Sequence, residues 1–138
     1  MIPILESLKS MYKDKFIIHL HNADRVGLHY DIRIENNGFL DSWACRYIPD
    51  LISGKKKKIL IIKQDPHNLE WFDFKGEITD GYGKGKISIW DKGSVEKVKW
   101  ENDKHYIVTF KGTKLKGTFH ILQYKGNKKT QFLMFKAK

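Results

Sequence analysis

The clearest pattern of hydrophobic and polar positions lies in two neighbouring segments near the N-terminus, residues 16–21 and 28–35. Because the side chains of a β-strand point alternately to opposite faces, every second residue shares a face. In the second segment, the apolar face consists of Leu28, Tyr30, Ile32 and Ile34. The polar face consists of His29, Asp31, Arg33 and Glu35. If residues 22–27 join the two segments as a hairpin, both apolar rows enter one core, and His19 and His21 join the polar face.

Short segments of strand length recur along the rest of the chain. Residues 39–47 and the apolar run 59–63 predict two more strands, with a loop at 50–58 and a break at 65–68. Further strands are predicted at 86–91, 94–100, 104–111, 115–123 and 130–136, with turns at 36–38, 92–93, 102–103, 112 and 126–127. This spacing predicts an all-β, mainly antiparallel fold, a compact closed or partly open β-barrel of about eight strands. Helical spacing of apolar residues within 1–15 adds a short N-terminal helical segment that packs as a lid or strap.

The length and charge of the chain narrow its class. Its 138 residues fit a single domain over residues 1–138. No apolar run approaches the roughly 20 residues of a membrane-spanning helix, and the N-terminus lacks a signal-peptide pattern, so we expect an intracellular, cytoplasmic protein. The net charge of +10, from 26 Lys and Arg against 16 Asp and Glu, favours a polyanionic partner such as nucleic acid. The alternative for this charge is a lysine-rich surface that serves solubility alone.

The polar face of the hairpin carries residue types that bind divalent metal ions. His29 and Asp31 lie two positions apart on one strand face, and His21 lies on the neighbouring strand. Two imidazoles and a carboxylate suit Mn²⁺, Zn²⁺, Fe²⁺ or Co²⁺, so the ligand set does not name the metal. The alternative is a set of surface histidines beside a cross-strand ion pair. Arg33 on the same face could hold a phosphate through two hydrogen bonds, or could pair with Asp31 or Glu35.

Other reactive side chains receive weaker or structural interpretations. Cys45 lies in an apolar segment, which favours a buried thiol over a nucleophile. His67 follows an expected buried strand, where a side chain can be held by the scaffold and still reach solvent. His105 and His120 lie within late strands and are assigned no role.

Several segments resemble the 3′-phosphoesterase domain of bacterial DNA ligase D and its free-standing archaeal relatives. Residues 28–35 (LHYDIRIE) resemble the family's L-H-Y-D-F-R-L-E, and residues 38–44 (GFLDSWA) resemble its G-V-L-K-S-W-A. Three later segments resemble the family's D-F-E-G, Y-G-A-G-T-V-I-V-W-D-R-G and K-L-R-G-R-W, namely 73–77 (DFKGE), 83–93 (GKGKISIWDKG) and 114–119 (KLKGTF). The match runs in order through residues 16–122, so the chain is identified as a free-standing member of this family.

The resemblance implies a compact β-barrel whose outer groove holds Mn²⁺ and a phosphate. It implies an enzyme that removes 3′-phosphates and terminal ribonucleotides from DNA or primer ends to leave a 3′-OH, as in non-homologous end joining. The family's metal ligands fall on His21, His29 and Asp31, and its phosphate-handling residues fall on Arg33 and His67. Four of these five side chains are the ones that strand alternation places on one polar face.

Three positions near these residues depart from or extend the family pattern and are candidates for accessory roles. His19 stands where the family has glutamine, and Trp71 stands where it has tyrosine. Asp65 matches the acidic residue two positions before the phosphate-site histidine. Two extra residues lengthen the connection within 24–27, and residues 1–15 show no clear counterpart of the arm that serves ribonucleotide removal in the family.

The sequence therefore predicts a Mn²⁺-dependent phosphoesterase, with Zn²⁺ or Co²⁺ as other candidate metals, that acts on DNA 3′ ends in duplex primer–templates. We expect a separate DNA ligase or polymerase as a partner, no membrane, and association with the nucleoid when DNA is bound. The main alternative is a non-catalytic nucleic-acid-binding β-barrel that keeps the fold without turnover. A small-molecule metalloenzyme of the cupin type is a further alternative, against which the positive charge and Arg33 argue.

Overall fold

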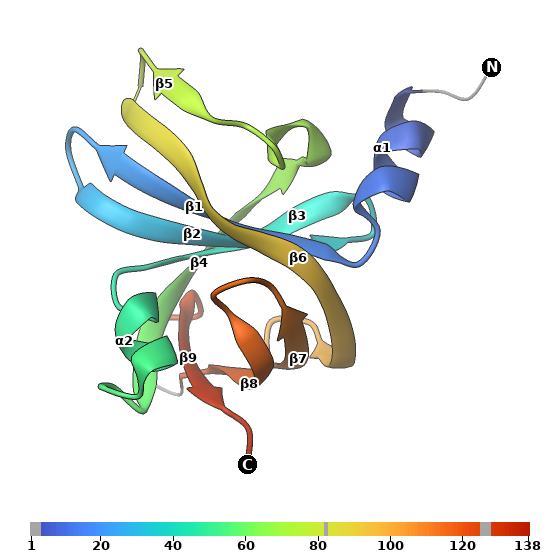
Figure 1. Cartoon of the computed structure of the whole chain (residues 1–138), viewed down its shortest axis with the longest axis vertical. Helices are drawn as coiled ribbons and strands as arrows, with labels where there is room; N and C mark the ends of the chain where they lie inside the picture. Colours follow the sequence, from blue (N-terminus) through green and yellow to red (C-terminus); the bar gives the residue numbers. More distant parts are fainter. Residues whose placement is uncertain (1–3, 82, 125–127) are drawn as a thin grey trace.

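The computed structural model describes residues 4–81, 83–124 and 128–138, and Figure 1 shows the course of the chain. Most of these residues belong to β-strands, which in chain order are β1 (Lys15–Ala23), β2 (Gly27–Asn36), β3 (Phe39–Cys45), β4 (Lys58–Asn68), β5 (Gly76–Ile78), β6 (Gly85–Glu101), β7 (His105–Lys111), β8 (Lys116–Gln123) and β9 (Gln131–Lys136). The helical segments are α1 (Ile4–Tyr12), α2 (Ile48–Ser53) and the 3₁₀ helix η1 (Leu69–Trp71). Within the described ranges, no helix is both long enough and apolar enough to cross a membrane.

The strands form an antiparallel sheet that closes on itself as a β-barrel. Their order is β1-β2-β3-β4-β9-β8-β7-β6-β5, and β1 also pairs with β6, which closes the ring. β5 lies outside the ring and pairs with the first residues of β6. β6 crosses the molecule in Figure 1, because its first half pairs with β1 and its second half pairs with β7. The predicted antiparallel barrel with a short N-terminal helix is confirmed.

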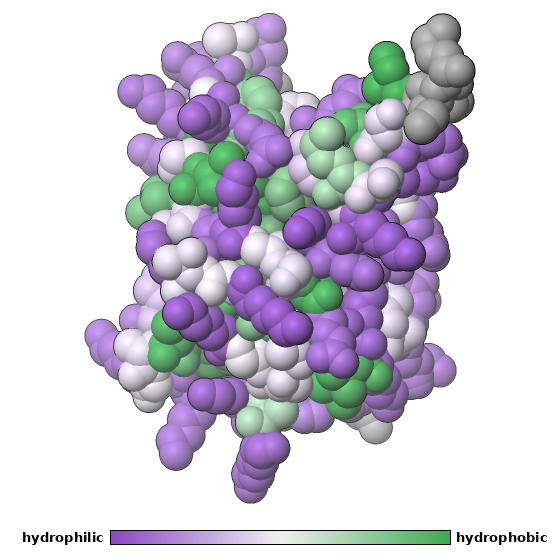
Figure 2. Space-filling model, turned by 45° about the vertical axis from the view of Figure 1, so that its right-hand side comes forward, coloured by the Kyte–Doolittle hydropathy of each residue, from purple (hydrophilic) through white to green (hydrophobic). Residues whose placement is uncertain are grey.

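The inside of the barrel is filled by the apolar faces that strand alternation predicts. Four members of the apolar row of the β1–β2 hairpin are fully buried there, namely Phe16, Ile18, Ile32 and Ile34, whereas Tyr30 is partly buried and Leu28 is exposed. Trp43 of β3 lies among them, and its ring centroid is 5.3 Å from that of Tyr106 on β7. Burying a large apolar side chain contributes about 1.5–3 kcal/mol, so this row determines which face of the hairpin points inward. On the surface shown in Figure 2, hydrophobic residues form separate patches among hydrophilic ones.

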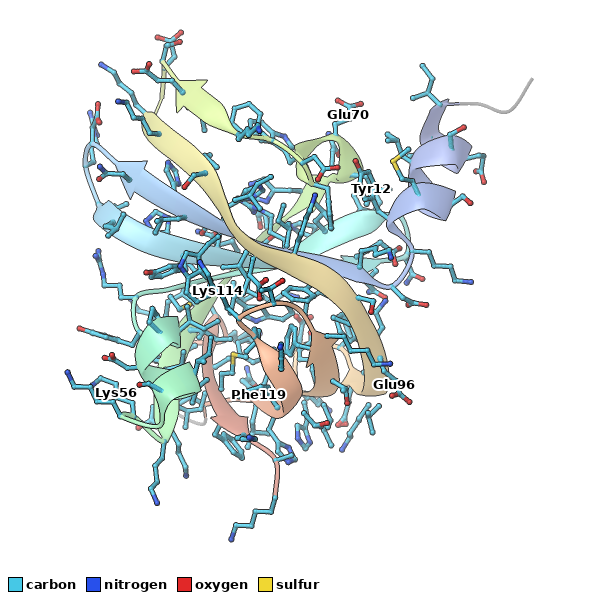
Figure 3. The ribbon with its side chains drawn as sticks, in the orientation of Figure 1. Tyr12, Lys56, Glu70, Glu96, Lys114 and Phe119 are labelled. Carbon is cyan, nitrogen blue, oxygen red and sulfur yellow. The ribbon has the colours of Figure 1, made fainter. Side chains whose placement is uncertain are left out.

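The helix α1 packs on the outside of the barrel beside η1. A second, smaller cluster of buried apolar side chains lies there, formed by Ile17, Leu40, Leu69 and Phe72. Tyr12 of α1 stacks on Phe72 with ring centroids 4.4 Å apart, and its hydroxyl donates to Asp73 Oδ2 at 2.7 Å. Figure 3 shows Tyr12 near η1, which carries Glu70. α1 therefore covers the end of the hairpin's outer face where Ile17 lies, as a strap would.

The predicted loop at residues 50–58 is correct only for 54–57, because α2 occupies its first part and β4 begins at Lys58. Pro49 lies in the first turn of α2, where a proline removes no intrahelical hydrogen bond. Gly54 ends the helix in the left-handed conformation, with φ of 83°, and its N–H donates to Leu51 O. A helix this short has too few residues for its periodicity to stand out in the sequence.

The predicted break at residues 65–68 is also wrong, because β4 continues to Asn68. The pairing of β4 with β9 ends at Ile62, so the proline that follows at 66 removes no hydrogen bond from that ladder. A register shift in the β3–β4 pairing marks a bulge between Gln64 and His67. Three positions apart, these two side chains would face opposite sides of a regular strand, whereas the bulge lets both line the same outer cleft.

The predicted turn at residues 92–93 is wrong as well, because β6 runs through it without interruption. A Cβ atom on Gly93 would lie 2.2 Å from the carbonyl oxygen of Lys111, so only glycine allows this approach of β6 to β7. The glycine lies where β6 changes its partner from β1 to β7. The turn at 36–38 is confirmed, with φ of 51° at Asn37 and 85° at Gly38. The turn expected at 126–127 lies outside the described residues.

Candidate active site

The polar face of the β1–β2 hairpin lies on the outside of the barrel. Antiparallel pairing places His21 directly opposite His29, and His19 directly opposite Asp31. Residues directly opposite one another in an antiparallel pair point to the same face, so these four side chains share one surface patch. Arg33 follows two positions after Asp31 on the same strand and therefore on the same face. The alternation of the sequence, with the hairpin pairing, is thus sufficient to bring four of the five principal site residues together, and His19 with them.

His21, His29 and Asp31 converge on a small volume that their atoms enclose. Asp31 Oδ2 lies 3.5 Å from His21 Nδ1 and 3.3 Å from His29 Nε2. One ligand atom from each residue falls within 4.8 Å of the other two, and all three residues are buried. This spacing allows three donor atoms to contact a single ion.

In each imidazole, one nitrogen is hydrogen-bonded to a backbone carbonyl, which leaves the other nitrogen free to bind a ligand. His21 Nε2 donates to the carbonyl oxygen of Gly83 at 2.8 Å, and His29 Nδ1 donates to that of Gly27 at 3.2 Å. In the neutral rings, His21 Nδ1 and His29 Nε2 then carry lone pairs that point at the Asp31 carboxylate. Two lone pairs facing a carboxylate repel it unless a cation lies between them. Backbone carbonyls that fix the imidazole in this way are common around metal-binding histidines.

Asp31 supplies a second sign that its carboxylate is built to hold a cation. Its Oδ1 atom is buried and has no hydrogen-bond partner among the described residues. Burial alone would raise the pKa of Asp31, but hydrogen bonds from His21 and His29, which form when a proton occupies the facing nitrogen, and the charge of Arg33 hold it well below the usual range. The same interaction with Asp31 raises the pKa of His29, so positive charge, whether a proton or a metal ion, is favoured between the two residues. The three residues therefore fit a divalent metal ion.

Arg33 connects this group of ligands to the rest of the site. Arg33 is 4% exposed, and its Nη2 lies 3.6 Å from Asp31 Oδ2. Nε donates to His19 Nδ1 at 3.1 Å, and Nη1 donates to Ser42 Oγ at 3.0 Å. Nη1 also lies 3.0 Å from Nδ1 of His67, on β4. These bonds fix the plane of the guanidinium beside the metal ligands.

His67 is held by Arg33 in one tautomer. A guanidinium can only donate, so the 3.0 Å contact with Arg33 Nη1 makes His67 Nδ1 an acceptor and leaves the proton on Nε2. The carbonyl of Asp65 lies 3.1 Å from the same Nδ1, but donating to it would require a proton that faces the guanidinium. Burial and the charge of Arg33 lower the pKa of His67. His67 is therefore a neutral imidazole with an Nε2–H donor at neutral pH.

His19 has a supporting position behind Arg33. It is 1% exposed, and burial together with Arg33 lowers its pKa to about 4, so the ring is neutral. Its Nδ1 accepts from Arg33 Nε, which makes it a positioning residue for the guanidinium. A glutamine at this position could accept the same hydrogen bond through its amide oxygen. The ring nitrogen of His19 can therefore replace the glutamine that the family has here.

These residues line an open cleft of about 930 Å³ on the outside of the barrel. His21, His29, Asp31, Arg33 and His67 all contribute to it, so the structure brings the five principal site residues together. Of the accessory candidates, Asp65 and Trp71 line the cleft, whereas His19 lies behind Arg33. The Trp71 ring meets the His67 ring edge to face, with centroids 6.3 Å apart.

Sequence reasoning missed several residues of this site. Arg46 donates to the carbonyl oxygens of Val26 and Leu28 at 2.6 and 3.0 Å and so holds the lengthened β1–β2 turn. Ser42, which accepts from Arg33, is also new. A signal for both exists in the strand predicted at residues 39–47, because alternation places Ser42, residue 44 and Arg46 on one of its faces. The carbonyl of Gly83 carried no such signal, since it meets His21 from 62 residues away.

Comparison with known proteins identifies the family of the chain. The model of the family described as "DNA Ligase D 3'-phosphoesterase domain" matches residues 19–123. The multifunctional non-homologous end joining protein LigD of Mycobacterium bovis is 36% identical over 118 residues, which cover 82% of this chain and 15% of that protein. LigD of Mycolicibacterium smegmatis is 36% identical over 86% of this chain and 16% of its own length, and LigD of Pseudomonas aeruginosa is 33% identical over 90% and 15%. The chain thus spans only about a sixth of these relatives. The chain belongs to the DNA ligase D 3′-phosphoesterase domain family.

Proposed function

We propose that this protein is a metal-dependent phosphoesterase that removes 3′-phosphates from DNA ends and leaves a 3′-OH. The observation that carries the proposal is the convergence of two imidazole lone pairs and a buried carboxylate beside Arg33 and His67. Family membership supports the reaction class. Such an arrangement offers a cation site, a guanidinium and a neutral N–H donor within one cleft, which are the groups that phosphate-ester hydrolysis uses.

His21 Nδ1, His29 Nε2 and the Asp31 carboxylate would hold the metal ion. A bound divalent ion supplies Lewis-acid charge for a phosphate oxygen and lowers the pKa of a bound water. Mn²⁺ is the proposed ion, and Zn²⁺ and Co²⁺ suit the same imidazole and carboxylate ligands. The carbonyls of Gly27 and Gly83 keep both imidazoles in the tautomers that metal binding requires.

Arg33 and His67 would act on the phosphate itself. The guanidinium stabilises negative charge on the phosphate oxygens, and it is held in position by His19 and Ser42. His67 would orient the phosphate by donating an Nε2–H hydrogen bond to one of its oxygens. Protonation of the leaving 3′ oxygen by this ring is disfavoured, because the neutral imidazole would become an imidazolate.

The proposed substrate is a DNA 3′ end in a duplex primer–template. The net charge of +10 suits contact with the phosphate backbone without readout of sequence. The relatives carry non-homologous end joining in their names, so we propose DNA repair by end joining as the process, with a separate ligase or polymerase as partner. Removal of terminal ribonucleotides, a nuclease activity, is proposed as a second reaction of the same site. The intracellular, nucleoid-associated location stays a prediction.

A primer–template with a 5′ label and a 3′-phosphate tests the proposal. We expect release of the phosphate in Mn²⁺, no release after chelation, and loss of release in Asp31→Asn, which keeps the shape of the side chain but removes its charge. A second primer with one 3′-terminal ribonucleotide measures the nuclease reaction separately. No release in Mn²⁺, Zn²⁺ or Co²⁺ contradicts the enzyme, and salt-sensitive DNA binding without release then supports the non-catalytic barrel.

A further inference from the structure

Phosphate chemistry explains the charged part of the cleft but not its apolar part. Tyr47 lines the cleft and is 48% exposed, although tyrosine is a large and partly apolar side chain. Leu60, 45% exposed, and Ile62 of β4 lie in the same lining. We propose that Tyr47 is a stacking platform for the base of the 3′-terminal nucleotide, with Lys56 reinforcing it. This inference rests on the proposed function, because it places the nucleoside that bears the scissile phosphate.

The local structure holds the Tyr47 backbone in a defined place. β3 ends at Cys45, which pairs with Tyr30, and Tyr47 comes two residues later as the residue before α2. Its carbonyl oxygen accepts from Leu51 N at 3.1 Å, which is the first helical hydrogen bond. The ring therefore projects from the junction of a barrel strand and a helix, both of which are rigid elements. A rigid aromatic ring loses little conformational freedom when it binds.

Lys56 is folded back onto this ring by the end of α2. The helix ends at Gly54, and the N–H of Lys56 donates to the carbonyl of Asp50 at 3.0 Å. This turn places Lys56 Nζ 4.7 Å from the centroid of the Tyr47 ring. Figure 3 shows Lys56 beside α2, on the side of the barrel where the helix packs. The ammonium group is attracted to the π-face and can also meet a phosphate of the bound strand.

The apolar part of the cleft, lined by Ala44, Leu60 and Ile62, begins directly beside the metal ligands. Ala44 of β3 pairs with Asp31 on one side and with Ile62 on the other. Because neighbouring strands lie about 4.8 Å apart, Ala44 and Ile62 are roughly 5 and 10 Å from Asp31 across the sheet. A 3′-terminal nucleotide has the same division, with a charged phosphate at one end and a sugar and flat base at the other.

The positive charge around Tyr47 favours DNA over a protein as the partner that binds in this part of the cleft. Arg46, the residue before Tyr47, also lines the cleft, and Lys56 belongs to the run of four lysines at 55–58. Stacking on an aromatic ring tolerates any base, since each base has a π-face. The platform should therefore increase affinity for a terminal nucleotide without selecting its identity.

Fluorescence of a primer–template with 2-aminopurine at its 3′-OH terminus tests the platform without turnover. We expect Tyr47→Ala to weaken binding about tenfold, the range expected for one stacked base, and to remove quenching of 2-aminopurine. Tyr47→Phe keeps the ring and should stay within about twofold of the original protein. Tyr124→Ala is the matched control, because Tyr124 is also 48% exposed but takes no part in the described cleft lining.

A primer whose terminal residue is abasic completes the design. If Tyr47 stacks on the base, Tyr47→Ala and the original protein bind the abasic primer equally, and Tyr47→Ala raises KM for the 3′-phosphate substrate while kcat is retained. Equal losses with intact and abasic primers, or no loss with either, overturn the platform. Failure of the proposed function looks different, because Tyr47-dependent quenching would then persist in a protein that releases no phosphate.

Discussion

Replacing Arg33 with lysine keeps the positive charge beside Asp31 but removes the planar fork of donors. In the structure, that fork reaches three acceptors on three other strands, His19 Nδ1, Ser42 Oγ and His67 Nδ1. The ammonium group of lysine is a single point that cannot reach all three. We therefore expect Arg33→Lys to disturb the site through hydrogen bonding, with the net charge unchanged.

The expected loss of stability follows from the number of acceptors left without a donor. His19 and Ser42 are buried and His67 is partly buried. If the lysine satisfies one of the three, two acceptors remain, and each unsatisfied buried group costs about 1–3 kcal/mol. Ser42 still donates a hydrogen bond from its hydroxyl to the carbonyl of Leu40, so its loss is small. The summed loss of stability therefore lies toward the lower part of the range for two unsatisfied groups. We expect the free energy of unfolding to fall by about 3 kcal/mol, which lowers Tm by roughly 10 °C for a chain of this length.

Chemical unfolding of metal-free protein in chelator is the assay, because a bound ion would add its own stabilisation. Arg25→Lys is the matched control, because it is the same substitution at a residue in an exposed turn. It should alter the free energy of unfolding by about 0.5 kcal/mol or less. The fall of about 3 kcal/mol should appear with an unchanged slope against denaturant. If Arg33→Lys is as stable as Arg25→Lys, the three hydrogen bonds do not hold the site together as described.

Three further predictions concern the metal ligands, the thiol and the barrel. Mn²⁺ at one hundred times Kd should stabilise the protein by about 2.7 kcal/mol and so raise its Tm. His29→Ala should abolish this rise, whereas the control His120→Ala should keep it. An equal rise in Tm in both variants would exclude His29 as a ligand. Burial raises the pKa of Cys45 to about 12, so below pH 10 the thiol stays protonated in the folded protein, and a disulfide reagent should label it only after unfolding; fast labelling of the native protein would contradict its burial. Asp91→Ala should lower the free energy of unfolding by about 2–4 kcal/mol, because Asp91 accepts from the backbone N–H groups of 92 and 113–115; a change below 0.5 kcal/mol in urea unfolding would contradict this.

Strand alternation was sufficient to predict the half of the site that lies on the hairpin. A period of two places His29, Asp31 and Arg33 on one face whatever the register, and burial of the opposite apolar row then orients that face outward. The turn at 36–38 followed from residues that tolerate positive φ. The resemblance to a known family added the role of His67, which alternation could not place.

The other half depends on interactions between segments distant in the sequence. His67 reaches Arg33 because β4 continues past its proline and a bulge changes the face of its side chains, neither of which follows from local pattern. His19 was expected on an exposed polar face, but α1 and η1 cover that end of the hairpin, and the ring is buried behind Arg33. Tyr47 lines the cleft as the residue before α2, a short helix that the sequence pattern did not predict.

The central claim is that His21 Nδ1, His29 Nε2 and the Asp31 carboxylate form one metal site, because carbonyls of Gly27 and Gly83 occupy the other imidazole nitrogens. Anomalous diffraction from crystals grown with Mn²⁺ tests it most directly. We predict a Mn²⁺ peak bound through these three groups, which disappears in crystals of Asp31→Asn. A Mn²⁺ ion bound through His21 Nε2 or His29 Nδ1, or no peak at this position in saturating Mn²⁺, would contradict the claim.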